Sequence, residues 1–469
     1  MTKLIPDRLK IALIGAGSLS FGRGTIADIV LSETLNQVPI DLVLMDIVAS
    51  HLDSNQRFAE QAVRSHQRAI SVNATTDLAE ALTGAHCVVT AIEVERYKYW
   101  MQDFHVPRKY GFTQIYGENG GPGGLFHTLR NMGPMLDIAQ AMQQLCPEAW
   151  LINFTNPEAK LVEAISRLST IKVVGLCHGV YMGREQLARI LELPEADIET
   201  VACGLNHFGW FQKIQRRSTG EDLYPRLTAN ESQAHWLAAW DEIALSRILF
   251  RTFGLWPYPG ANHCGEYFRW SRDFFAGDRF QYFHDPVWGA AWEQTPPPTF
   301  LYSTVANPNA VPFFPEKPVE QLYPEFDATS EMQPDALQPS GEDAVRLIEA
   351  LCFDQAMDFP ALNLPNHGAI PGLDDELVVE IPARADGRGI QRQRLEPLPE
   401  GVTAMIRLQG SIHKLLIEAY QERSRNKLLQ AVLLDPTVSS YANAVAMINE
   451  MCELQKELLP VLEWKEMRP

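Results

Sequence analysis

Short apolar runs alternate with longer amphipathic stretches along the first two hundred residues. The runs lie within residues 9–14, 40–47, 85–94, 149–153 and 171–176. Continuous apolar runs are typical of parallel strands buried on both faces, and the stretches between them suit covering helices. The pattern predicts an α/β protein with a Rossmann-like dinucleotide-binding sheet over residues 1–200. A mixed α+β domain, carrying substrate, metal and oligomer contacts, is expected over residues 201–469.

The first predicted strand ends in a glycine turn. Gly15, Gly17 and Ser18 follow the strand and precede a helix-like segment, an order that brings backbone amides to a pyrophosphate. The full G-x-G-x-x-G spacing is not met, because the third glycine is Gly22. Asp46 ends the second strand, where an acid accepts hydrogen bonds from a ribose and favours NAD over NADP. We therefore predict an NAD site, with a plain βαβ scaffold as the alternative.

Polar residues follow the strand predicted at residues 149–153. Asn153 ends this strand, and Asn156 precedes a proline and another helix. Ligands of open α/β sheets bind at the carboxyl ends of strands, so both asparagines are candidate site residues. A turn with a helix-capping asparagine is the alternative.

A thiol and an imidazole occupy comparable positions about thirty residues apart. Cys177 follows the strand at 171–176, and His207 lies at a bend in the β-rich segment 198–214. No C-x-x-C or H-x-x-x-H pair occurs, so a structural zinc site with four protein ligands is not expected. Two protein ligands would leave a divalent metal open to a substrate diol. Spacing alone leaves two ordinary loop residues as the competing interpretation.

Composition narrows the class of ligand. The chain has 469 residues, a formal net charge of −18 and seven widely spaced cysteines. Its acidic balance argues against nucleic acids and anionic membranes, and no apolar run reaches the roughly 18 residues of a membrane span. An odd cysteine count does not suit a disulfide framework, and the first residues contain no apolar signal core. We expect a cytoplasmic protein that acts on a small molecule.

Several motifs occur in an order that matches one enzyme family. IGAGS, GENGGPGG, NFTNP, LCHGV and GLNHFGW resemble the motifs of glycoside hydrolase family 4, and the likeness continues at 253–270, 363–383 and 433–451. That family contains NAD- and manganese-dependent α-glucosidases, α-galactosidases, hexuronidases and 6-phospho-glycosidases. The resemblance covers most of the chain and implies NAD and Mn²⁺ as cofactors.

The resemblance also implies roles for individual residues. Cys177 and His207 match the metal ligands of the family. The glycine turn with Asp46 matches its dinucleotide site, and Asn153 and Asn156 match polar residues near cofactor and sugar. His178 directly follows the metal cysteine, as in members that act on unphosphorylated sugars, where the phospho-sugar branch typically has Asp.

The implied chemistry is oxidation followed by elimination, unlike the two-carboxylate hydrolysis of most glycosidases. NAD would oxidise C3 of the sugar, a base would remove the C2 proton, and the aglycone would leave; water addition and re-reduction would follow. Relatives carry an Asp as base where this chain has Ala261. We favour His263 as the base, because imidazole titrates near neutral pH, with Tyr258 and Tyr267 as alternatives. His178 is a further catalytic candidate.

The substrate expected from this comparison is a hexose or hexuronate glycoside without phosphate. Glu118, where relatives often have Asp, and Arg269 are candidate sugar-binding residues beside Asn156. Three alternatives stay open: an NAD-dependent sulfoquinovosidase, an NAD-dependent sugar dehydrogenase with net hydride transfer, and a non-catalytic NAD sensor. Apolar helix faces in the carboxyl half indicate a homodimer or homotetramer.

Overall fold

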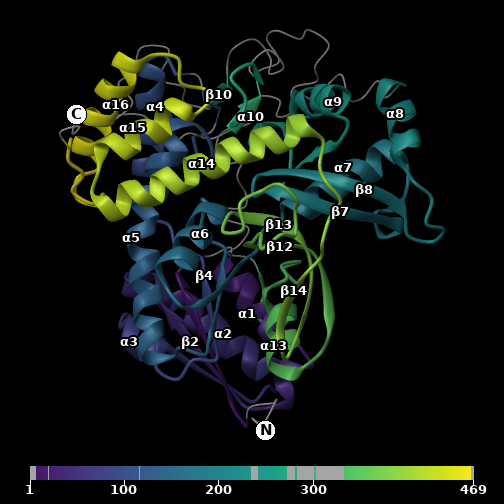
Figure 1. Ribbon diagram of the computed structural model, residues 1–469. Coiled ribbons are helices and arrows are strands. Elements are labelled where there is room, and N and C mark those ends of the chain that lie inside the picture. Colours follow the sequence, from purple (N-terminus) through teal and green to yellow (C-terminus); the bar gives the residue numbers. More distant parts are fainter. Residues whose placement is uncertain are drawn as a thin grey trace.

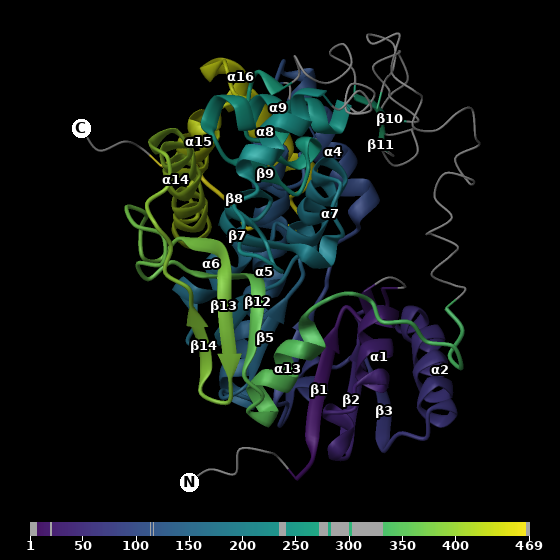
Figure 2. The same ribbon diagram turned by 90° about the vertical axis from the view of Figure 1, so that its right-hand side faces the viewer.

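A nine-stranded sheet organises the lower half of the molecule in Figure 1. The computed structural model describes residues 7–18, 21–112, 114–115, 117–233, 241–271, 280–282, 300–302 and 332–465. A smaller antiparallel sheet and a group of C-terminal helices form the upper half (Figures 1 and 2). The predicted α/β class is confirmed.

Six strands of the large sheet are parallel. They are β1 (Leu9–Ile14), β2 (Ile40–Met45), β3 (Ile70–Thr75), β4 (Cys87–Thr90), β5 (Trp150–Asn153) and β6 (Lys172–Gly175). Their order is β3-β2-β1-β4-β5-β6, the double-wound order of dinucleotide-binding folds, in which the direction of strand addition reverses between β1 and β4. Ligands bind at that reversal, and the glycine turn after β1 lies there.

Helices join these strands. They are α1 (Phe21–Leu31), 3-10 helix η1 (Leu35–Gln37), α2 (Ala49–Ser65), α3 (Leu78–Leu82), α4 (Arg96–Lys109), α5 (Gly121–Leu145), α6 (Glu158–Leu168) and α7 (Gly179–Leu191). Helix α5 begins within the GENGGPGG segment, at Gly121, where Pro122 suits the first turn of a helix. Part of this glycine-rich segment is therefore helical.

Three antiparallel strands from the carboxyl half continue the same sheet. They are β12 (Met357–Pro365), β13 (Val378–Asp386) and β14 (Gly389–Arg392), and they follow helix α13 (Ala344–Phe353). β12 lies beside β6, with Asn363 opposite Gly175. The division at residue 200 stays a prediction, and one sheet contains strands from both sides of it.

The upper half contains the remaining elements. They are η2 (Glu195–Asp197), β7 (Ile198–Leu205), β8 (Phe208–Arg216), α8 (Tyr224–Gln233), α9 (Asp241–Phe253), β9 (Trp256–Tyr258), α10 (Ala261–Gly265), β10 (Phe280–Tyr282), β11 (Phe300–Tyr302), α14 (Glu400–Glu422), α15 (Arg425–Leu434) and α16 (Tyr441–Leu454). β7, β8 and β9 form one antiparallel sheet, and β10 pairs with β11. No helix in the described part of the chain is long and apolar enough to cross a membrane.

Candidate active site

The thiol of Cys177 and the imidazole of His207 meet at the carboxyl end of the large sheet. Cys177 lies two residues after β6, and His207 lies in the tight turn between β7 and β8, after a cis Asn206–His207 peptide bond. Cys177 Sγ is 3.1 Å from His207 Nε2. The end of β6 and the turn between β7 and β8 are far apart in the sequence. In the fold they bring Cys177 Sγ and His207 Nε2 together.

The chemistry of this donor pair suits a divalent metal. Burial lowers the pKa of His207 to about 3, so the ring is neutral and can act as a ligand. Burial, together with the charge of Glu380, raises the pKa of the Cys177 thiol, so metal binding would displace its proton. No described acceptor binds His207 Nδ1, and the described residues contain no group of three metal-ligating side chains. A metal held by this pair would keep open positions for oxygen ligands.

His263 faces His207. It lies in α10, and the two ring centroids are 4.7 Å apart with the planes inclined by 34°. Burial lowers the pKa of His263, which favours a neutral ring, while the nearby charge of Glu118 acts in the opposite direction. The structure therefore brings the favoured base next to the predicted metal ligands.

The GENGG segment is held beside these rings by two buried ionisable side chains. Glu266 Oε1 accepts from the Glu118 amide at 2.8 Å, and Oε2 accepts from the Asn119 amide at 3.2 Å. Lys160 Nζ donates to the Asn119 carbonyl at 2.6 Å. No described residue bonds the side-chain amide of Asn119, although it is fully buried. Such an orphaned amide beside Glu118 suits a polar ligand.

The glycine turn after β1 forms a cradle that suits a dinucleotide. Gly15 has a φ of +85°, and a Cβ there would lie 2.3 Å from the Ala91 carbonyl oxygen. The Gly17 amide donates to Asp46 Oδ2 at 3.0 Å, and a Cβ on Gly17 would lie 2.6 Å from that oxygen. Ser18 Oγ accepts from the amide of Phe21, the first residue of α1, at 3.2 Å. Only glycines let the backbone approach this closely.

Comparison with known proteins agrees with this geometry. A sequence profile for "Family 4 glycosyl hydrolase" matches residues 10–193, and one for the "Family 4 glycosyl hydrolase C-terminal domain" matches residues 202–438. The chain belongs to glycosyl hydrolase family 4. The family resemblance predicted from the motifs is confirmed.

Individual family 4 relatives match this chain along nearly its whole length. An alpha-glucosidase of Erwinia rhapontici is 27% identical over 97% of this chain and 97% of its own. An alpha-galactosidase of Bacillus subtilis (strain 168) is 28% identical over 96% of this chain and 99% of its own. A 6-phospho-alpha-glucosidase from gut microorganisms, solved in complex with NAD and Mn²⁺, has a TM-score of 0.75 at 21% identity, covering 97% of this chain and 100% of that one. The last likeness shows the fold.

Tyr258 lies behind the site of this family 4 chain. Its ring is fully buried, stacks on Phe211 at 4.5 Å and packs over Gly209. Burial and the adjacent Glu380 carboxylate raise the pKa of Tyr258 well above its usual value, so the phenol keeps its proton. This environment does not favour Tyr258 as a base.

His178 and Arg269 lie outside the Cys177–His207 group. The His178 side chain is 48% exposed, and its Nδ1 is 3.8 Å from Glu342 Oε1. Arg269 is exposed, and no hydrogen bond or ion pair joins it to another described residue of the site. Two other arginines near motifs are bound elsewhere: Arg23 to Asn55 and Arg130 to Asp103.

The two asparagines at the end of β5 have different environments. Asn153 is fully buried; its Oδ1 accepts from Thr90 Oγ1 and from the Thr155 amide, both at 3.0 Å. Its side chain therefore shapes the turn after β5. Asn156 is half-buried and precedes a cis proline, and its carbonyl accepts from Asn131 Nδ2 at 2.8 Å.

A pair of buried glutamates behind Cys177 and His207 was not predicted. Asn206 and Asn363 donate to Glu380 Oε1 at 3.2 and 3.1 Å. Glu158 lies against Gly175, where a Cβ would be 1.2 Å from Oε1, and no described donor binds either of its oxygens. Burial raises the pKa of both carboxyls. Glu158 directly follows the Asn156–Pro157 dipeptide after β5, and this position was the available signal.

Proposed function

We propose that this chain is an NAD- and divalent-metal-dependent glycosidase acting by oxidation and elimination on a hexose or hexuronate glycoside without phosphate. The observation that carries the proposal is the meeting of Cys177 Sγ and His207 Nε2 at 3.1 Å, with the His263 ring against His207. This group lies at the same edge of the sheet as the glycine turn. Ordinary loop residues would have no reason to converge there.

The chain offers a separate place for each cofactor. Cys177 and His207 would hold the metal, for which we propose Mn²⁺, while Gly15, Gly17 and Asp46 would hold NAD. When bound, NAD supplies a hydride acceptor for sugar C3, and the metal supplies positive charge for the sugar oxygens. Asp46 already accepts a hydrogen bond from Gly17, so its carboxylate is fixed for contact with a ribose.

His263 is the residue to which we assign removal of the C2 proton. Its ring lies beside His207 and within the field of Glu118, whose negative charge would stabilise the imidazolium formed. Glu266 and Lys160 hold the Glu118 segment in place through its backbone. His178, at the more exposed side, remains a candidate contact for the sugar or the aglycone, as do Asn156 and Arg269.

Support for an unphosphorylated sugar comes from one residue and from relatives. His178 follows the metal cysteine, as in family members acting on such sugars. The relatives of Erwinia rhapontici and Bacillus subtilis are an alpha-glucosidase and an alpha-galactosidase. Arg130 is engaged in a fully buried ion pair with Asp103, so it does not offer a phosphate site.

The decisive experiment is aglycone release from the nitrophenyl α-glucoside, α-galactoside, α-hexuronides and sulfoquinovoside. We expect release to require both NAD⁺ and Mn²⁺ under reducing conditions, without accumulation of NADH. In D₂O the released sugar should carry deuterium at C2, since elimination exchanges that proton with solvent. Stoichiometric NADH would instead indicate a dehydrogenase, and release only from a sulfoquinovoside would indicate a sulfoquinovosidase.

Cys177→Ser tests the metal site separately. Both turnover and the affinity for Mn²⁺, measured by titration calorimetry, should fall by more than the roughly 10–100-fold typical of losing an outer-shell partner. Cys452→Ser, which removes a thiol from α16, is the matched control. Unchanged Mn²⁺ affinity in Cys177→Ser would refute the ligand role.

We further propose that the chain forms a homodimer or homotetramer. Exposed apolar side chains gather near the C-terminus: Leu433, Leu434, Tyr441, Leu454, Val461 and Trp464. Neighbouring exposed apolar groups of this kind favour association between copies.

A further inference from the structure

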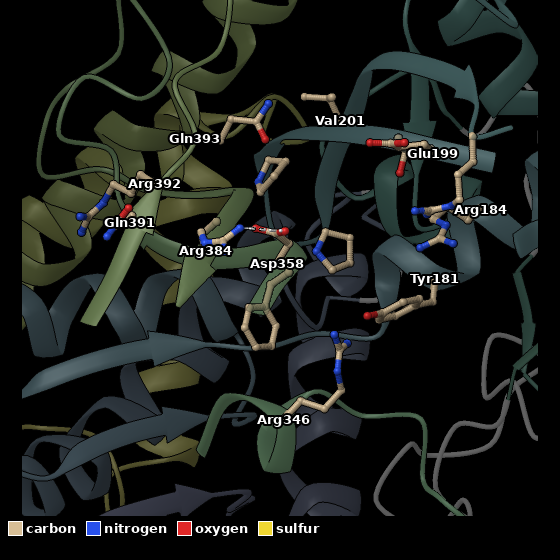
Figure 3. Close-up of a pocket in the computed structure, with 16 residues that line it drawn as sticks. Tyr181, Arg184, Glu199, Val201, Arg346, Asp358, Arg384, Gln391, Arg392 and Gln393 are labelled. Atoms are coloured by element: carbon tan, nitrogen blue, oxygen red, sulfur yellow. Dashed lines mark hydrogen bonds and ion pairs between the residues drawn. The ribbon is translucent and has the colours of Figure 1, made fainter. Parts of the chain in front are cut away.

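A second pocket, separate from the Cys177–His207 group, lies between α7, α13, β7 and the strands β12–β14 (Figure 3). Its volume is about 630 Å³, within the range of small-molecule sites. None of the predicted catalytic, cofactor, metal or substrate residues lines it.

The lining of this pocket is strongly basic. Five arginines line it, against the two carboxylates of Glu199 and Asp358. They are Arg184, Arg217, Arg346, Arg384 and Arg392. The whole chain has a net charge of −18, yet the arginines that line this hollow outnumber the lining carboxylates by three. Glu195 and Asp343, outside the lining, pair with Arg184 and Arg346. A concave basic site concentrates anions, because low-dielectric walls focus its field.

Each of three of these arginines contacts the protein through only part of its guanidinium group. The remaining N–H groups are available to a ligand. Arg217 Nε donates to the Ala196 carbonyl at 3.1 Å, and Arg392 Nε donates to the Pro365 carbonyl at 2.7 Å. Arg184 is only 13% exposed; its Nη2 lies 3.8 Å from Glu195 Oε1, and no described acceptor binds its Nε. A buried guanidinium with an unbonded nitrogen points to an acceptor supplied by a ligand.

The other two arginines form ion pairs at the solvent-facing side. Arg384 Nη1 is 3.3 Å from both carboxylate oxygens of Asp358, and Arg346 Nη1 is 2.5 Å from Asp343 Oδ1. Both arginines are about half exposed. Figure 3 shows Arg346 reaching toward the hollow from α13 and Arg184 approaching from α7, with Tyr181 near both. Exposed pairs contribute little stability, so an anion can compete for these guanidiniums.

Apolar walls complete the hollow. Phe359 is buried, and Pro360 and Pro382 also line the pocket. The pairing of β12 with β13 shifts register between Phe359 and Leu362, at this wall. Such irregularities are over-represented beside binding sites.

We propose that this pocket binds a small organic polyanion through its carboxylate or phosphate groups. The planar guanidinium fork binds both groups in bidentate fashion, and several arginines on different walls favour a ligand with more than one charged group. The proline and phenylalanine surfaces bind the carbon skeleton between those groups. This proposal does not depend on the glycosidase function.

Titration calorimetry of the full chain in metal-free buffer of constant ionic strength tests this site. Citrate and inorganic phosphate are the probes, with glucose as the uncharged control. We expect saturable binding of citrate, weaker binding of phosphate and none of glucose. The combined variant Arg184→Gln/Arg384→Gln should bind citrate at least about 10-fold more weakly. Lys213→Gln, an exposed charge on β8 outside the pocket, should bind like the wild type.

Two further measurements keep the outcome interpretable. Circular dichroism melting without citrate should show that the double variant is folded, and Arg392→Gln provides an independent second variant. Equal citrate affinity in wild type and variants would overturn the proposal, because the anion would then bind elsewhere. Loss of an oligomer in the double variant, without citrate binding by the wild type, would also overturn it and assign the pocket to an acidic segment of a second copy.

Discussion

Glu266 shows how one buried carboxyl couples the site to pH. Two backbone amides bind it, yet complete burial dominates and, with the charge of Glu118, raises its pKa to about 8. The folded protein therefore holds a proton that the unfolded chain loses near pH 4.5. Between about pH 4.5 and 8 the folded state binds more protons, so this group makes stability fall as pH rises.

Glu266→Gln removes this dependence while keeping an oxygen that accepts from the amides. We expect the melting temperature of the variant relative to wild type to rise steadily from pH 5 to pH 8. Glu453→Gln, an exposed residue of α16, should show no such trend. A constant difference across the pH range would mean that Glu266 is ionised throughout.

The sequence predicted some site residues and not others, for a physical reason. Cys177 and His207 follow recognisable strands, and position after a strand largely determines which edge a residue occupies. Lys160 and Glu380 gave no such signal, because a charged residue in a helix or strand is usually solvated. Their burial depends on neighbours more than a hundred residues away, such as Glu266 for Lys160 and Asn206 for Glu380.

Among the helices, one buried ion pair joins three elements. Arg130 of α5 binds both carboxylate oxygens of Asp103 in α4, at 2.8 and 3.2 Å. Gln455, at the end of α16, bonds both partners. Arg130 and Asp103 are essentially fully buried, so each charge is stabilised mainly by the opposite charge of its partner.

Arg130→Met should lower the free energy of unfolding by about 3–5 kcal/mol, since it leaves the Asp103 charge buried and unpaired. Urea denaturation measures this change. The double variant Arg130→Met/Asp103→Leu should recover much of the loss, and Arg64→Met, an exposed residue of α2, should be near neutral. A double variant less stable than the sum of its single variants would contradict this account.

Elements buried on both faces were easier to predict than those at an edge. Runs such as β1 and β2 are almost entirely apolar and were identified within a residue or two. β3, at the edge of the sheet, has the sequence ISVNAT and is largely half-exposed, so it lacked the apolar pattern and was missed. The joining of β12 to β6 was also not predictable, because no local pattern specifies a partner strand.

At the scale of the whole molecule, the exposed apolar residues near the C-terminus predict a defined oligomer. Light scattering after size exclusion should give the mass of a dimer or tetramer. Leu434→Glu combined with Tyr441→Lys should shift that mass toward the monomer, because both side chains are exposed and apolar on α15 and α16. Gln61→Glu on α2 is the control, and a monomeric wild type would refute the prediction.

The pairing of Asn363 with Gly175 also matters while the chain is being synthesised. At about 5–20 residues per second, a ribosome needs roughly ten to forty seconds to add the residues between these partners. During that time β6 is an open edge with unpaired backbone groups, a template for wrong pairing. The strand just before Cys177 is thus open to wrong pairing in the nascent chain, and cells that overproduce this protein should gain more soluble product from slower translation or chaperone capacity than from a stronger core.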